Sequence, residues 1–135
     1  REELFVITKI WHTQKHQPEV SLKQQLKDLD LEYIDLYLDH FPFTSCKVDG
    51  QVIKTPTHIF WKNMEGLVKT GLTKSIGVSN YHSQLLLDIL SYCEIKPAVN
   101  QFEFHPYFHQ VDLLNLCKKH DIQVMAYSSI CKGMY

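Results

Sequence analysis

The sequence has no long hydrophobic run and no large excess of charge of either sign. No apolar stretch approaches the roughly 20 residues that a membrane-spanning helix needs. The first residues, Arg-Glu-Glu-Leu-Phe-Val, have the pattern of neither a signal nor a transit peptide. The formal net charge is -1, so the composition does not favour nucleic acid or an anionic membrane as a partner. We expect an ordinary soluble globular protein that binds neither.

Cysteines at the spacing of a redox or zinc motif are also missing. The four cysteines, at positions 46, 93, 117 and 131, form no Cys-x-x-Cys pair. Cys93 and Cys117 lie on apolar helical stripes, as reduced core cysteines do. This use of cysteine predicts a reducing compartment, which we take to be the cytosol.

Metal and phosphate motifs are interrupted or absent. His12 and His16 are four residues apart, as are His105 and His109, a spacing that places two ligands on one helix face. The first pair precedes the expected helix, Pro106 interrupts the second, and neither has a carboxylate at a complementary spacing. We therefore expect no metal site. The sequence also has no Gly-x-Gly-x-x-Gly, no phosphate-binding loop and no Gly-x-Ser-x-Gly.

The most informative stretch that is present alternates strictly over residues 33–40. One face carries Ile34, Leu36, Leu38 and His40, and a period of two predicts a strand. Pro42 ends the strand because proline cannot donate a ladder hydrogen bond. His40 is thus the last residue in register on the apolar face, at the end where parallel α/β sheets place their chemistry. From this strand alone, a histidine satisfied within the core is the favoured interpretation.

The rest of the chain alternates strands with helices. Strands are predicted at 4–10, 33–40, 73–78, 98–102 and 122–127, and helices from Pro18, from 56–57, over 82–92 and around 111–117. Pro18 suits the first turn of its helix, and Gly71 is placed to end the second helix. The polar stretch 43–56 is expected to be an irregular loop that serves as a lid or substrate loop.

This alternation predicts the α/β class, with parallel strands joined by right-handed crossovers. The repeat length of roughly 25–35 residues fits a (β/α)8 TIM barrel, which needs roughly 200 residues or more. We therefore expect residues 1–135 to form one partial barrel domain with about five central βα units. The barrel's N-terminal and C-terminal parts would be lacking.

Polar side chains stand at every predicted strand end. They are Lys9, His40, Ser79 with Asn80, Gln101 with Glu103, and Tyr127 with Ser128. Each has an ordinary alternative: a solvated lysine at position 9, a helix cap at 80, a core aromatic at 127. In a barrel, however, these ends converge on one mouth, and five polar ends at one rim favour a functional site.

Five blocks of sequence resemble the aldo-keto reductases. They read FVITKIW (5–11), DLYLDHFP (35–42), GVSNY (77–81), PAVNQFEFHP (97–106) and AYS (126–128). They follow that family's order at about its spacing, and together they cover essentially the whole chain. The resemblance implies strands three to seven of the barrel. It also implies an NADPH-dependent enzyme that reduces small-molecule aldehydes or ketones to alcohols.

The resemblance also implies roles for nine positions. Lys9 matches the lysine that lowers the pKa of the family's tyrosine proton donor, and His40 matches the histidine that orients the carbonyl. The positions matching the cofactor site are Ser79, Asn80, Gln101, Tyr127 and Ser128, with the ring of Tyr127 matching the one that stacks on the nicotinamide. Trp11 and Phe41 match the aromatic wall of the substrate pocket. Neither the residues nor the resemblance predicts an oligomeric state.

Several positions depart from the family pattern. Residues 129–133 read Ser-Ile-Cys-Lys-Gly where Pro-Leu-Gly is usual, Phe41 replaces a tryptophan, and Asp39 stands where an apolar residue is common. Asp39 faces away from His40, so we expect it to affect packing more than catalysis. The family's catalytic Asp and Tyr would lie upstream, so residues 1–135 alone are not expected to reduce aldehydes. The alternative is a non-catalytic cofactor-binding or regulatory protein on the same scaffold, although Lys9 and His40 favour the enzyme.

Overall fold

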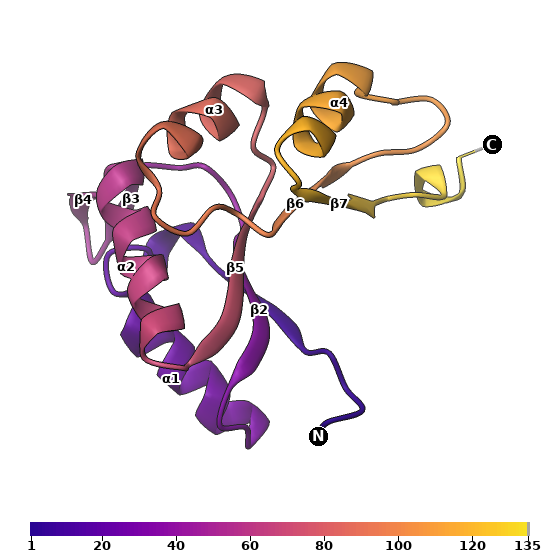
Figure 1. Ribbon diagram of the computed structural model, residues 1–135. Coiled ribbons are helices and arrows are strands. Elements are labelled where there is room, and N and C mark those ends of the chain that lie inside the picture. The colour runs from indigo at the N-terminus through magenta and orange to yellow at the C-terminus, as the bar shows by residue number, and fades with distance from the viewer. Residues whose placement is uncertain (135) are drawn as a thin grey trace.

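The computed structural model describes residues 1–134 and is built around a five-stranded parallel sheet (Figure 1). Its strands, in spatial order, are β1 (Ile7–Ile10), β2 (Ile34–Asp39), β5 (Thr73–Ser79), β6 (Val99–Glu103) and β7 (Gln123–Tyr127). The helices are α1 (Pro18–Leu29), α2 (Thr57–Lys69), α3 (Ser83–Tyr92) and α4 (Val111–Lys119). A separate hairpin pairs β3 (Ser45–Val48) with β4 (Gln51–Lys54), and two short 3-10 helices are η1 (His12–Gln14) and η2 (Cys131–Gly133).

The order of the strands in the sheet is their order in the chain, and every neighbouring pair is parallel. Each connection contains one α-helix, and Figure 1 shows all four α-helices on the same side of the curved sheet. Repeated right-handed crossovers give this arrangement, which forms the wall of a (β/α) barrel. Within residues 1–134 no helix covers the other, concave side. The prediction of a partial α/β barrel is therefore confirmed.

Two hydrophobic clusters lie on the two faces of the sheet. The larger one packs the helices against outward residues such as Tyr37 and Phe102. The smaller one consists of Leu36, Leu38 and Val99 on the concave side. Both faces of β2 are thus buried, as is usual for a parallel strand between two layers. The predicted alternation is confirmed for Leu36 and Leu38. Ile34 differs, because it packs in the larger cluster on the helix side. It lies before Leu36, where the regular pairing of β2 with β1 begins.

Local signals place most helix ends correctly. Pro18 is the first residue of α1, where its missing N–H costs no hydrogen bond. Gly71 follows α2 with φ of 77°, the left-handed conformation that glycine adopts without a Cβ penalty. The first strand is shorter than predicted, because residues 4 and 5 lie exposed before β1. Among residues 1–134, no helix combines the length and apolar character needed to cross a bilayer.

The prediction of an irregular loop over 43–56 is wrong, because most of this stretch forms the β3–β4 hairpin. Asp49 and Gly50 make its two-residue turn, with φ of 49° and 82°. Positive φ at both positions is what the tightest hairpin turns require, and Asp-Gly is a preferred pair for it. The hairpin contacts η1 and lies beside α2 (Figure 1).

Candidate active site

Lys9 lies near the end of β1 and His40 directly follows the neighbouring strand β2, both at the carboxyl end of the sheet. Thr8 hydrogen-bonds Gln25 of α1, so Lys9, the next residue, faces the concave side. Burial lowers the pKa of Lys9. Burial, followed by the nearby charges of Lys9 and His12, lowers the pKa of His40. At neutral pH the His40 imidazole is therefore neutral, and it lies beside a partly desolvated lysine.

Aromatic rings surround the His40 imidazole. The Trp11 ring meets it edge-on with centroids 4.9 Å apart, and the Phe41 ring stacks on it at 4.7 Å. Phe43, just before the hairpin, extends this stack at 5.5 Å from Phe41. These residues come from the segments that follow β1 and β2, as expected for loops at the carboxyl ends of barrel strands. The wall is apolar, and an imidazole is set into it.

Asn80 joins three segments around the mouth. Its Nδ2 donates to the backbone carbonyl of His40 at 2.9 Å and to Ser79 Oγ at 3.1 Å. Its Oδ1 accepts a hydrogen bond from the Tyr127 hydroxyl at 2.7 Å. The backbone of Asn80 is left-handed, with φ of 63°, which asparagine tolerates better than most residues. The ends of β2, β5 and β7 are thus linked through one side chain.

Ser79 and Gln101 face one another across the β5–β6 pair. Ser79 is fully buried, and its hydroxyl donates to the Gln101 carbonyl at 2.9 Å. The Gln101 side-chain Nε2 contacts Met125 Sδ at 2.7 Å, and its Oε1 is buried without a hydrogen-bond partner. A buried acceptor without a partner is costly, so Gln101 is ready to receive a donor from a bound molecule.

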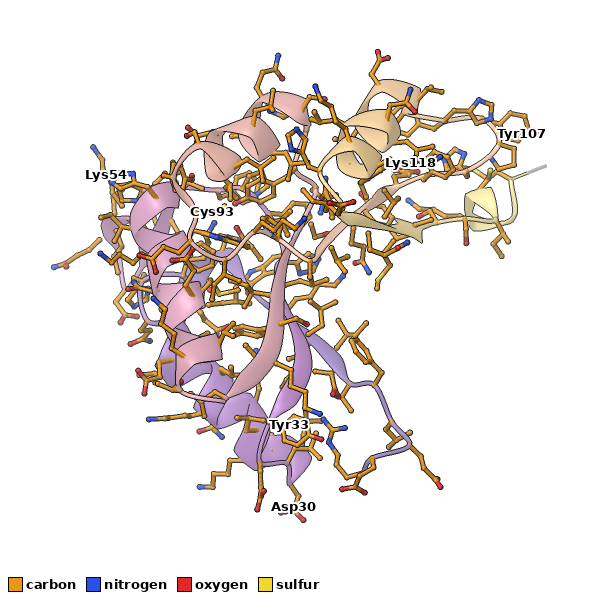
Figure 2. The ribbon with its side chains drawn as sticks, viewed as in Figure 1. Asp30, Tyr33, Lys54, Cys93, Tyr107 and Lys118 are labelled. Atoms are coloured by element: carbon orange, nitrogen blue, oxygen red, sulfur yellow. The ribbon has the colours of Figure 1, made fainter. Side chains whose placement is uncertain are left out.

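Tyr127 and Ser128 close the site at the end of β7. Tyr127 lines a pocket of about 210 Å³ with Asn80, Phe102 and Gln110. Burial, and secondarily the charge of Glu103, raise the pKa of its hydroxyl, so it remains a hydrogen-bond donor at neutral pH. Ser128 has φ of 51° and turns the chain away from the strand. Figure 2 shows Tyr107 at the tip of the nearby β6–α4 loop.

Sequence reasoning missed a buried polar cluster behind this mouth. Lys15 Nζ lies 2.7 Å from Asp39 Oδ2, and the Tyr81 hydroxyl donates to the same oxygen at 2.6 Å. Asp39 does face the helix side, away from His40, where burial raises its pKa against the opposing effect of Lys15. The signal was an aspartate inside an apolar strand, because a buried carboxylate needs a cationic partner. The sequence alone does not reveal which lysine is the cationic partner of Asp39.

A parallel β/α wall with polar side chains at its carboxyl end is typical of the (β/α) barrel class, and the comparisons specify the family. A sequence model of the Aldo/keto reductase family matches residues 1–135. The chain is 41% identical over 154 residues to 4-dihydromethyl-trisporate dehydrogenase of Mucor mucedo, covering 100% of this chain and 48% of that protein. It is 41% identical over 142 residues to human aldo-keto reductase family 1 member A1, covering 96% of this chain and 44% of that protein.

Solved structures agree with the sequence comparisons. An aldo-keto reductase of Bombyx mori in complex with NADP superimposes with a TM-score of 0.88 at 40% identity, covering 95% of this chain and 42% of that one. The aldose reductase of Giardia lamblia gives 0.87 at 38% identity, covering 95% and 46%. The chain belongs to the aldo/keto reductase family. It spans about half the length of the curated relatives it matches.

Proposed function

We propose that the protein containing this chain is an NADPH-dependent oxidoreductase that reduces aldehydes or ketones to alcohols. The observation that carries the proposal is the placement of Lys9 beside His40, next to the apolar wall of Trp11 and Phe41. A carbonyl compound needs an apolar surface for its carbon skeleton and polar donors for its oxygen. This corner of the sheet offers both.

The roles of Lys9 and His40 follow from where charge develops. When a bound nicotinamide cofactor supplies hydride to a carbonyl carbon, negative charge builds on the carbonyl oxygen. A neutral imidazole has an N–H that can donate to this oxygen and orient it. The Lys9 ammonium stabilises a neighbouring anion and lowers the pKa of a hydroxyl placed beside it. In this proposal that hydroxyl comes from a tyrosine upstream of Arg1.

The mouth fits the carboxamide end of a nicotinamide. Gln101 Oε1 is buried and lacks a partner, so it can accept a hydrogen bond from a carboxamide N–H. The polar atoms of Ser79 and Asn80 already bond within the chain, and they hold the site in place as well as bordering it. Tyr127 supplies a ring for stacking, and Ser128 follows it at the rim. The NADP complex of the Bombyx mori relative supports this choice of cofactor.

Residues 1–135 act in this proposal as one partial barrel domain within a longer protein. Within residues 1–134, the five strands leave β1 and β7 as unpaired sheet edges, and the chain spans only about half the length of its relatives. Residues 1–135 alone should therefore give no measurable turnover, because one proton donor and part of the barrel are lacking. A cytosolic location is part of the same proposal, supported by four cysteines that are all free thiols.

The test follows NADPH absorbance with a reactive aromatic aldehyde in the longer protein. His40→Gln and Lys9→Met should each lower kcat/KM by roughly 10²–10⁴-fold, the usual contribution of a positioned acid or base. His58→Gln, at an exposed histidine on α2, is the matched control and should change nothing. Wild-type protein that binds NADPH without turning over any carbonyl would instead support the non-catalytic alternative. Turnover unaffected by His40→Gln would refute the assignment.

A further inference from the structure

A buried ionic cluster lies on the helix side of the sheet, directly behind the mouth. Lys15 is 1% exposed, and Asp39 and Tyr81 are 0% exposed. Both Lys15 and Tyr81 bond the same oxygen of Asp39, at 2.7 and 2.6 Å. Lys15 Nζ also lies 4.3 Å from the centre of the Phe60 ring. We call Lys15, Asp39 and Tyr81 the rear cluster.

Each member of the rear cluster is tied to a residue of the candidate site. Asp39 directly precedes His40, and Tyr81 directly follows Asn80. Lys15 donates a second hydrogen bond, of 3.2 Å, to the backbone carbonyl of Phe41. Asp39 is the last residue of β2, where successive residues point to opposite faces, so fixing its side chain restrains His40. Tyr81 restrains Asn80 through the peptide bond that they share in the turn after β5. The rear cluster thus clamps the ends of β1, β2 and β5 from behind.

A second buried contact continues the cluster toward β6. Asn100 Nδ2 donates to the backbone carbonyl of Tyr81 at 2.9 Å, and Asn100 precedes Gln101. Helix-facing polar side chains are therefore bonded behind β2, β5 and β6, immediately beside three inward site residues. Tyr81 contributes to this arrangement with both its hydroxyl and its carbonyl.

Stability alone does not account for such a cluster. Moving two charges out of water is expensive, and replacing a buried ion pair by apolar residues of similar size is often neutral or stabilising. What a buried pair does provide is direction, because its hydrogen bonds are satisfied in only one arrangement. An apolar side chain at position 39 could slide or rotate, whereas an aspartate bonded to Lys15 and Tyr81 cannot.

We propose that Lys15, Asp39 and Tyr81 are positioning residues that hold His40, Phe41 and Asn80 in their working orientation. The positional claim rests on the geometry above, and only its kinetic consequence rests on the proposed function. The two can therefore be tested separately.

The test uses two variants of the longer protein. Lys15→Met with Asp39→Leu removes equal and opposite charges and leaves no unpaired buried ion, so it should fold. Tyr81→Phe removes one hydroxyl and no charge at neutral pH. Asp35→Asn is the matched control, since Asp35 is a buried aspartate of the same strand, pairs with Arg1 at 2.7 Å, and sits near the far end marked by Tyr33 (Figure 2).

The first readout is the titration of the His40 ring by NMR, which needs no catalysis. Neither variant changes the net charge near His40, so a shift in its titration midpoint reports a change of position or solvation. Both variants should move the midpoint upward toward the ordinary histidine value, and Asp35→Asn should not. The second readout is kinetic: kcat should fall roughly tenfold with little change in KM, as expected when a catalytic group is misplaced.

The outcomes separate the positional claim from the function. If no form of the protein turns over a carbonyl, the proposed function fails, while the NMR titration still decides the positional claim. Folded variants with a wild-type His40 titration would overturn the positional claim, and so would an equal shift in Asp35→Asn. If the double variant does not fold, Tyr81→Phe decides by the same two readouts.

Discussion

Gly77 is the position where the smallest possible substitution should cost the most. It lies in β5 in register with Leu38 of β2. A Cβ added at Gly77 would lie 2.7 Å from Leu38 Cδ2 and 2.7 Å from the Val99 carbonyl oxygen. The Leu38 methyl can rotate, but the Val99 backbone cannot move without β6. Gly77→Ala should therefore push β5 and β6 apart.

Two opposing contributions determine how Gly77→Ala changes the free energy of unfolding. Overpacking of this kind costs about 1–3 kcal/mol, and the reduced entropy of the unfolded chain returns about 0.4–1 kcal/mol. We expect a net loss of about 1–2 kcal/mol in the free energy of unfolding. Gly66→Ala makes the same chemical change within α2, where an added Cβ meets nothing within 4 Å. There the better helix propensity of alanine should stabilise by about 0.5–1 kcal/mol.

Urea unfolding of both variants beside the wild type measures the two effects, because the midpoint shifts while the slope stays constant. The midpoint should fall for Gly77→Ala and rise for Gly66→Ala. NADPH binding should weaken only in Gly77→Ala, since β6 carries Gln101 two residues beyond Val99. A Gly77→Ala variant as stable as the wild type would show that β5 and β6 do not approach as closely as described.

Two further predictions concern Tyr127 and Asp35. Tyr127→Ala should weaken NADPH binding roughly tenfold, because a stacking loss of about 1.4 kcal/mol corresponds to a tenfold change in Kd. Tyr127→Phe keeps the ring but loses the hydrogen bond to Asn80, so its loss of affinity should be intermediate. Fluorescence titration with NADPH measures both. The Val6 amide, and then Arg1, hold the pKa of Asp35 below its ordinary value. The stabilisation that the Asp35 carboxylate gives the folded protein is therefore complete above about pH 4, its ordinary pKa. It is lost as pH falls through the lower pKa that Asp35 has in the folded protein. Urea midpoints at decreasing pH should fall less steeply in Asp35→Asn; parallel curves would contradict this.

Periodicity in the sequence is sufficient to predict the sheet and its helices. The alternation of β2 distinguishes Leu36 and Leu38 from Tyr37, and the structure places them in different clusters. Proline and glycine mark the ends of α1 and α2 because their backbone constraints act locally. Such signals lie within a few residues of the structure they determine, so a single sequence reveals them.

The β3–β4 hairpin was missed although its signal was present. Asp49 and Gly50 form a favourable turn pair, but the flanking strands are only four residues each and mostly exposed. Short exposed strands carry little hydrophobic alternation, so the polar composition suggested a loop. The rear cluster was missed for a different reason. Lys15 and Asp39 are 24 residues apart, and only the fold brings their charges together.

Asn80 shows why the two halves of the candidate site should respond together. Strand β6 separates β5 from β7 in the sheet, yet the Asn80 side chain reaches both the His40 carbonyl and the Tyr127 hydroxyl. The residue proposed to orient the carbonyl and the ring proposed to stack on the cofactor are thus joined by two hydrogen bonds through one amide. Each bond is worth only about 0.5–1.5 kcal/mol, but each fixes a direction. A substitution at Tyr127 should therefore disturb the His40 backbone as well as the stacking surface, because Asn80 cannot keep both contacts once one partner moves.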